Sequence, residues 1–183
     1  MGLWKYIKEH MQNHLTQTVS ESSSSFCYEE LIIYTEAFTK KLDGEKCCAI
    51  YCKSELAAVI TLLGCFAAGI TAVPLSPRYD TVYSKQVIDF THPTCTITDT
   101  DGKFSVYHIS ESEYEANDNA PALVICTDPA EGGMKKVVLS EESIIANIHN
   151  KSDYTLSTRP LCQVTELLRA ITNGEKIDFY SGT

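Results

Sequence analysis

The stretch LVICTDPAEGGMKKVVLS, which spans Leu123–Ser140, decides the fold. Its first four residues are apolar and predict a strand buried on both faces, and a loop of small residues follows them. A second strand and a helix that begins at Ser140 complete the segment. This order of elements is typical of a loop that binds phosphate. The loop itself, however, carries aspartate, proline and glutamate where phosphate needs hydroxyl groups and free backbone N–H groups.

The composition narrows the class of protein. The chain has 183 residues and a formal net charge of -9 at pH 7. This acidic balance argues against nucleic acid or an anionic membrane as the main partner. No apolar run is long enough to cross a membrane, and residues 1–15 are too polar for a signal peptide. We therefore expect a cytoplasmic protein of one domain or slightly more.

The eight cysteines lie in surroundings that argue against disulfides. The sequence has no Cys-x-x-Cys pair and no Cys/His cluster with the spacing of a zinc site. Cysteine in an apolar run behaves as a small hydrophobic residue, and reduced thiols are typical of the cytosol. The cysteines in apolar runs are Cys47, Cys48, Cys52, Cys65 and Cys126. We predict free thiols and no metal site.

Apolar periodicity predicts alternating helices and strands. The expected helices span residues 28–42, 54–69, 83–90 and 161–171, with another beginning at Ser140. The expected strands span residues 47–52, 70–73, 94–98, 104–109, 122–126, 136–139 and 176–180, the fourth of them at a sheet edge. Short connections between strand, helix and strand predict parallel strands with right-handed crossovers. Asp99–Gly102 is expected to be a turn, and His92 a loop residue at a helix end.

The N-terminal segment is predicted to be an amphipathic helix, because Leu3, Ile7, Met11 and Leu15 recur at helical spacing. We expect this apolar face to pack on its own domain. Residues 20–25 are rich in serine and predict a mobile link, which leaves open a second interpretation in which the helix binds a partner.

Three segments, in order, carry a resemblance to a known family. FCYEEL at residues 26–31 and LLGCFAAGITAVPLSP at residues 62–77 match its first two motifs, and the loop after Cys126 matches the third. The helix around residues 142–148 is similar to the helix that follows the third motif. The chain thus resembles the N-terminal part of the adenylate-forming enzymes, which include acyl-CoA synthetases, luciferases and the adenylation domains of non-ribosomal peptide synthetases.

The resemblance implies an α/β fold. It predicts the doubly wound, three-layer parallel-sheet subdomain of the family's N-terminal domain, together with a remnant of the second subdomain. The expected segments are an N-terminal amphipathic helix at 1–19, a serine-rich link at 20–25, an α/β subdomain at 26–120, and a degenerate phosphate-loop region with the remnant at 121–183.

The loop departs from the family's pattern of threonine, serine, glycine and lysine. Pro129 removes an N–H donor and fixes φ. Asp128 and Glu131 add negative charge where ATP brings more, and two like charges about 4 Å apart repel by about 1 kcal/mol in water and by several times that in a closed site. The residues that the resemblance assigns to a vestigial phosphate loop are Thr127, Gly132 and Lys135. We therefore expect no cofactor, with ATP and Mg²⁺ binding only if a partner completes the site.

The family's adenine-binding loop, magnesium-binding glutamate, ribose-binding aspartate and catalytic lysine have no counterpart in the sequence. We therefore expect no catalytic residues and no adenylation by this chain alone. The favoured hypothesis is a truncated pseudoenzyme that binds or scaffolds a protein partner, either a second copy or a biosynthetic enzyme, in a peptide-synthetase or natural-product pathway.

Other interpretations stay open. The chain would be the N-terminal half of a split ATP-dependent acyl or aminoacyl ligase if a partner chain supplied the missing elements. It would be an unrelated α/β domain if a small molecule bound beyond the carboxyl ends of its strands. It would also fit a piece of a longer protein, and the loop at 127–136 would fit an ordinary surface turn.

Overall fold

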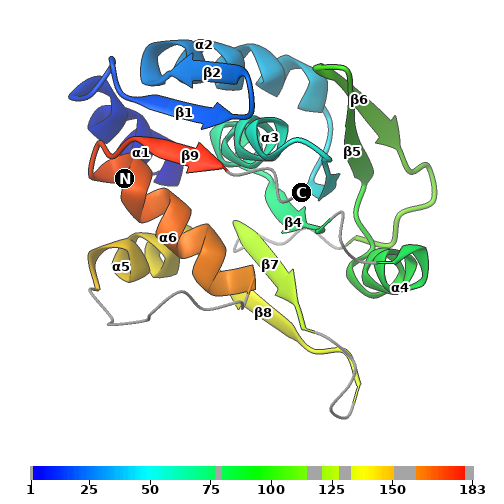
Figure 1. Ribbon diagram of the computed structural model, residues 1–183. Coiled ribbons are helices and arrows are strands. Elements are labelled where there is room, and N and C mark those ends of the chain that lie inside the picture. Colours follow the sequence, from blue (N-terminus) through cyan, green and yellow to red (C-terminus); the bar gives the residue numbers. More distant parts are fainter. Residues whose placement is uncertain (1, 77–79, 115–120, 128–132, 151–159, 180–183) are drawn as a thin grey trace. The chain divides into compact units, whose positions relative to one another are not determined.

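The computed structural model describes residues 2–76, 80–114, 121–127, 133–150 and 160–179 (Figure 1). The chain divides into two compact units. We call residues 35–140 the sheet unit, and residues 1–34 together with 141–183 the terminal unit.

The sheet unit is built on a six-stranded sheet with the order β6-β5-β3-β4-β7-β8. Its strands are β3 Cys47–Tyr51, β4 Thr71–Pro74, β5 Cys95–Thr100, β6 Lys103–His108, β7 Leu123–Cys126 and β8 Lys136–Leu139. The four inner strands pair in parallel, and each edge strand pairs antiparallel with its neighbour. The expected parallel sheet is therefore confirmed, as is the predicted edge position of the strand that follows Gly102.

Helices cover both faces of this sheet, because successive side chains of a strand point to opposite sides. Cys47 belongs to an apolar cluster with Val87 of α4 (Thr81–Thr91). Cys48 points to the other face and contacts Cys65 of α3 (Glu55–Ala68). This is the expected three-layer, doubly wound arrangement.

Local sequence signals set the ends of these elements. Ser54 caps α3 by accepting a hydrogen bond from the backbone N–H of Ala57 at 3.2 Å, and Gly69 ends the helix with φ +68°. Asp80 caps α4 in the same way, through the N–H of Tyr83 at 2.7 Å. Asp101 and Gly102 both have positive φ and form the two-residue turn between β5 and β6.

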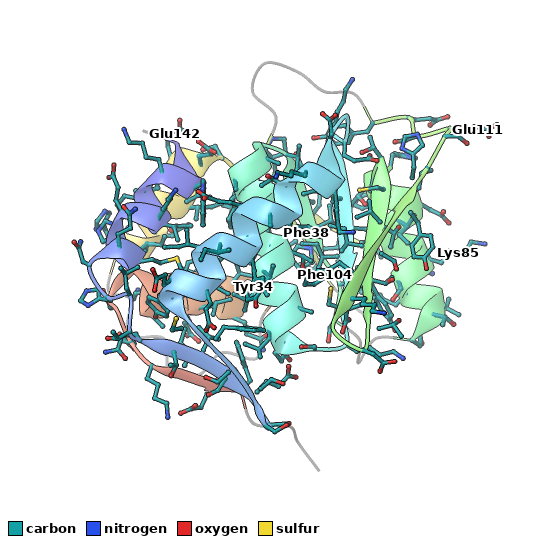
Figure 2. All side chains as sticks on the ribbon, turned by 90° about the horizontal axis from the view of Figure 1, so that it is seen from above. Tyr34, Phe38, Lys85, Phe104, Glu111 and Glu142 are labelled. Atoms are coloured by element: carbon teal, nitrogen blue, oxygen red, sulfur yellow. The ribbon has the colours of Figure 1, made fainter. Side chains whose placement is uncertain are left out.

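Helix α2 (Tyr28–Thr39) and a short 3-10 helix (Lys40–Leu42) follow the first motif. Phe38 of α2 is 3 % exposed and meets Phe104 of β6 edge to face, with ring centroids 5.0 Å apart (Figure 2). Gly64 of α3 lies directly against the same ring, because a Cβ atom there would stand 2.6 Å from Cδ1 of Phe38. Side-chain packing thus leaves no room for a Cβ atom at Gly64 unless a neighbour shifts.

The terminal unit combines helices with a three-stranded sheet of order β2-β1-β9. Its elements, besides the start of α2, are α1 Leu3–Gln12, β1 Thr18–Glu21, β2 Ser24–Cys27, α5 Glu141–His149, α6 Pro160–Thr172 and β9 Ile177–Phe179. Leu3, Ile7 and Met11 of α1 are fully buried, and α1 contacts α5 and α6. The apolar face of α1 therefore packs within its own unit, as expected. The helix is shorter than the predicted segment 1–19, since it ends at Gln12 and leaves Leu15 outside it and 37 % exposed.

The predicted mobile link at residues 20–25 is wrong. These residues belong to a hairpin in which β1 pairs antiparallel with β2, and Ser22 turns with φ +53°. β1 also pairs in parallel with β9, and its Val19 is fully buried. The serines are therefore held by backbone hydrogen bonds. The division into units also differs from the predicted segments, since residues 121–140 belong to the sheet unit.

Candidate functional site

The candidate site is the loop between β7 and β8, which form an antiparallel hairpin with Cys126 opposite Lys136. The backbone N–H of Thr127 donates to the carbonyl oxygen of Lys135 at 2.8 Å, and the Thr127 hydroxyl donates to the same oxygen at 3.3 Å. The structure therefore brings together Thr127 and Lys135, two of the three predicted site residues. The third, Gly132, lies outside the described residues, as do the other residues from 128 to 131.

Two described side chains of this loop, those of Thr127 and Lys136, contact other groups of the protein. Because the Thr127 hydroxyl already donates to a backbone carbonyl, it would have to give up that bond to donate to a phosphate. Lys136 places its amino group 5.3 Å from the centroid of the Phe90 ring on α4, which is a cation–π contact. The Lys135 side chain is exposed. Lys136 is exposed as well, so both loop lysines are open to solvent.

Two residues support the hairpin that the sequence reasoning did not assign to the site. The Tyr83 hydroxyl on α4 donates to the carbonyl oxygen of Cys126 at 3.3 Å. Met134 packs against the apolar cluster that contains Val73, Val87 and Val124. The sequence indicated only that Tyr83 begins the helix predicted at residues 83–90. These contacts anchor both ends of the loop on the face of the sheet that α4 covers.

Thiol chemistry at this place is disfavoured. Burial raises the pKa of Cys126, and the positive charge of Lys136 offsets part of that effect. Burial also raises the pKa of Cys47 to about 12. Both thiols therefore stay protonated near neutral pH, and neither supplies a ready nucleophile.

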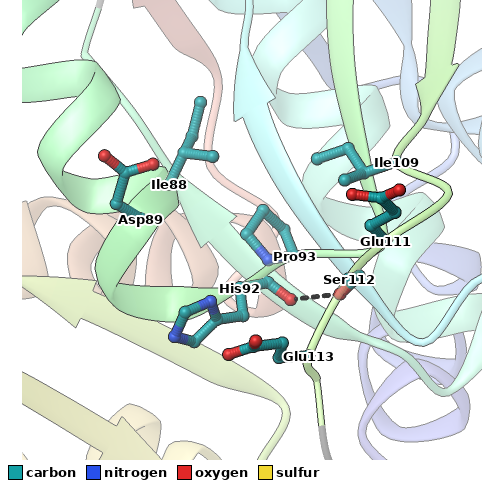
Figure 3. Close-up of a pocket in the computed structure, with 8 residues that line it drawn as sticks. All are labelled: Ile88, Asp89, His92, Pro93, Ile109, Glu111, Ser112 and Glu113. Carbon is teal, nitrogen blue, oxygen red and sulfur yellow. Dashed lines mark hydrogen bonds between the residues drawn. The ribbon is translucent and has the colours of Figure 1, made fainter.

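A shallow pocket of about 220 Å³ lies between the C-terminal end of α4 and the segment after β6 (Figure 3). His92 ends α4 with a left-handed backbone, φ +49°, as expected of a residue at a helix end. The Ser112 hydroxyl donates to the carbonyl oxygen of His92 at 2.6 Å. The lining residues are Ile88, Asp89, His92, Pro93, Ile109, Glu111, Ser112 and Glu113. Three carboxylates in this lining disfavour a phosphate ligand, so the pocket does not extend the loop site.

In the described part of the chain, no group of three or more Cys, His, Asp or Glu side chains is arranged to hold a metal ion. No helix of the described residues is long and apolar enough to span a bilayer.

The sequence matches no protein-family model and no curated protein. Solved structures do share its fold. The complex of VinN with 3-methylaspartate superposes with a TM-score of 0.76 at 16 % identity, over 98 % of this chain and 62 % of VinN. The N-terminal subdomain of Klebsiella oxytoca NpsA, in complex with 3-hydroxyanthranilyl-AMSN, superposes with a TM-score of 0.75 at 15 % identity, over 98 % of this chain and 53 % of that chain.

The luciferase-like enzyme from the nonluminescent mealworm Zophobas morio superposes with a TM-score of 0.75 at 11 % identity, over all of this chain and 55 % of the enzyme. The chain therefore spans less than two thirds of each of these structures. Identities of this size speak for the fold alone. The chain has the α/β fold of the N-terminal part of the adenylate-forming enzymes.

Proposed function

We propose that this chain is a pseudoenzyme with the adenylate-forming fold, which binds or scaffolds a protein partner and does not adenylate a substrate. The observation that carries the proposal is the pairing of the two described ends of the loop, in which the Thr127 hydroxyl donates to the carbonyl oxygen of Lys135. The loop sequence adds Asp128, Pro129 and Glu131, which remove an N–H donor and bring negative charge. At an effective dielectric of about 20, each like-charge contact at about 4 Å would cost about 4 kcal/mol.

Protein contact is supported by apolar side chains at both edges of the six-stranded sheet. Tyr107 on β6 is 59 % exposed, and Val138 on β8 is 50 % exposed. Within the described residues, neither edge strand has a neighbour on its outer side, so both present free backbone hydrogen-bonding groups. Exposed edges with apolar side chains are surfaces that another chain can cover.

The type of pathway is part of the same proposal. VinN has been solved with 3-methylaspartate, and a coronafacic acid ligase from Pectobacterium brasiliense shares the fold with a TM-score of 0.72. These similar structures support a role in natural-product or non-ribosomal peptide biosynthesis, where the partner would be a biosynthetic enzyme or a second copy of this chain.

The test is isothermal titration of the full chain with ATP and Mg²⁺, and then with AMP. We expect no binding at millimolar nucleotide. A matched variant carries the family's residues in the loop, Asp128→Ser, Pro129→Gly, Ala130→Thr and Glu131→Thr, and it is expected to gain nucleotide binding. Micromolar binding by the unmodified chain would overturn the proposal, as would pyrophosphate exchange catalysed by the chain alone.

A second candidate function is the N-terminal half of a split ATP-dependent ligase that a partner chain completes. The N-terminal subdomain of NpsA with its bound 3-hydroxyanthranilyl-AMSN favours it, as does an inhibitor-bound N-terminal domain of FACL13 from Mycobacterium tuberculosis that matches 97 % of this chain. The exposed Lys135 would then contact phosphate. Pyrophosphate exchange that arises only on mixing the chain with its partner would establish this function in place of the first.

A further inference from the structure

A row of three side chains crosses neighbouring strands of the sheet unit. Cys48 on β3 stands opposite Cys95 on β5, and Cys95 stands opposite His108 on β6. Paired residues of adjacent strands project from the same face, so the three side chains lie on one side of the sheet. The two cysteines are free and fully buried, and their sulfur atoms are 2.7 Å apart.

The backbone at this pair suits a covalent bond. Directly paired residues of adjacent strands lie about 4.8 Å apart, which is within the Cα separation of about 4.4–6.8 Å found in disulfides. A shared metal ion fits less well, because two sulfurs on one zinc ion stand about 3.8 Å apart. The pair is therefore arranged for a bond between the sulfurs themselves.

A buried carboxylate lies beside this pair. The side chain of Glu45 is 7 % exposed, and its Oε1 is 3.0 Å from Nδ1 of His108, whose side chain is 67 % exposed. The other oxygen, Oε2, is buried and has no hydrogen-bond partner among the described residues. The hydrogen bond with Cys48, burial and the Glu45 charge all raise the pKa of the Cys95 thiol. This thiol is therefore protonated at rest, like Cys47 and Cys126, and its sulfur can attack only if a neighbouring base takes the proton during the attack. Glu45 is thus close enough to interact with Cys95 while its partner His108 reaches solvent.

We propose that Cys48 and Cys95 are a modification site, a dithiol that a hydroperoxide oxidises to a disulfide across β3 and β5, with Glu45 as the proton acceptor. This site is independent of the loop between β7 and β8. The reagent has to be small, because both thiols are covered in the folded protein. β6 is an edge strand, so local opening of that strand is sufficient to admit it (Figure 1).

The chemistry balances in two steps. Glu45 takes the proton of the Cys95 thiol as the sulfur attacks one peroxide oxygen and the O–O bond breaks. The leaving hydroxide takes the proton from Glu45 and departs as water, which leaves Cys95 as a sulfenic acid. The Cys48 sulfur then attacks the Cys95 sulfur and expels a second water that carries the Cys48 proton. Two thiols are oxidised by two electrons, and one hydrogen peroxide is reduced to two waters.

The test treats the full chain with hydrogen peroxide, blocks the remaining thiols by alkylation, and measures intact mass and linked peptides. We expect the loss of two hydrogen atoms and a peptide in which Cys48 is joined to Cys95. Cys48→Ala should leave Cys95 at the sulfenic acid, whereas Cys126→Ala should not change the product. Alkylatable Cys48 and Cys95 under conditions that oxidise the partly exposed Cys27 would overturn the proposal.

The variant Glu45→Gln tests whether Glu45 accepts the proton of Cys95 or only lies close to it. We expect disulfide formation to slow by about 10²-fold or more, as for loss of a general base, while Glu111→Gln, an exposed control, has no effect. Circular dichroism checks that both variants are folded. An unchanged rate in folded Glu45→Gln would refute the role of Glu45, and an absent disulfide in the unmodified chain would refute the site as a whole.

Discussion

Replacing Gly64 by alanine tests how closely α2 and α3 pack in the sheet unit. The added Cβ atom would stand 2.6 Å from Cδ1 of Phe38, well inside normal contact distance. The ring has little room to move, because Phe38 is 3 % exposed and its other side meets Phe104. Either the ring or the helix must therefore shift.

The expected magnitude is the balance of two opposing effects. Alanine in place of glycine favours a helix interior by about 1 kcal/mol, whereas overpacking a core costs about 1–3 kcal/mol. We expect Gly64→Ala to lower the free energy of unfolding by about 1 kcal/mol, and by up to about 2 kcal/mol if the helix cannot shift. In a Phe38→Leu background the obstacle is smaller, so the same change should be neutral or stabilising.

Urea unfolding followed by circular dichroism measures both backgrounds, and the double-mutant cycle should give a coupling of about 1–2 kcal/mol. Ala58→Gly, at a half-buried position of the same helix, calibrates the helix preference without the clash. The packing argument is refuted if Gly64→Ala has the same effect with phenylalanine and with leucine at position 38.

Three further predictions concern single contacts. Burial, and to a smaller extent the charge of Glu175, raises the pKa of Tyr28 from 10.0 to about 12. The protonated side chain therefore contributes at most about 2–3 kcal/mol to the free energy of unfolding, and this contribution is complete below pH 10. It is lost as the pH rises toward 12. Unfolding curves at pH 9 and pH 11 should therefore differ more for the unmodified chain than for Tyr28→Phe, and equal differences would contradict the assignment. Ser54→Ala removes the cap of α3 and should cost about 1 kcal/mol, seen as a Tm lower by about 2–4 °C, whereas Ser54→Asp should keep the Tm near its original value. Tyr83→Phe removes the hydrogen bond to Cys126 and should cost about 1 kcal/mol in urea unfolding, and a change below the experimental error would show that packing alone holds the loop.

The sheet unit could be predicted because its signals are local. The cap at Ser54, the glycine at 69 and the apolar strand that follows all act within a few residues of each other, and the structure has each element where the sequence placed it. The Asp-Gly turn before β6 is equally local. Such signals define elements and their order, and short crossovers then leave few topologies.

The terminal unit was less predictable because its pairings are distant in sequence. Val19 pairs with Ile177, and no sequence signal near residues 20–25 predicts that partner strand. A serine-rich composition is therefore a poor sign of a mobile link when a distant strand is available to pair with it. At the candidate site, the motif correctly placed Thr127 and Lys135 in one loop. The hydrogen bond from the Thr127 hydroxyl to the Lys135 carbonyl could not be predicted, because it depends on the register of the hairpin and the sequence pattern does not fix that register.

The packing of α1 against helices from the end of the chain has a consequence for synthesis on the ribosome. The apolar face of α1 is covered by α5 and α6, which follow more than a hundred residues later in the chain. At about 5–20 residues per second, Leu3, Ile7 and Met11 stay uncovered for roughly 10–30 s while the rest of the chain through α6 is made. During that interval the nascent chain carries uncovered apolar side chains, which are exposed to association with other chains until α5 and α6 are made.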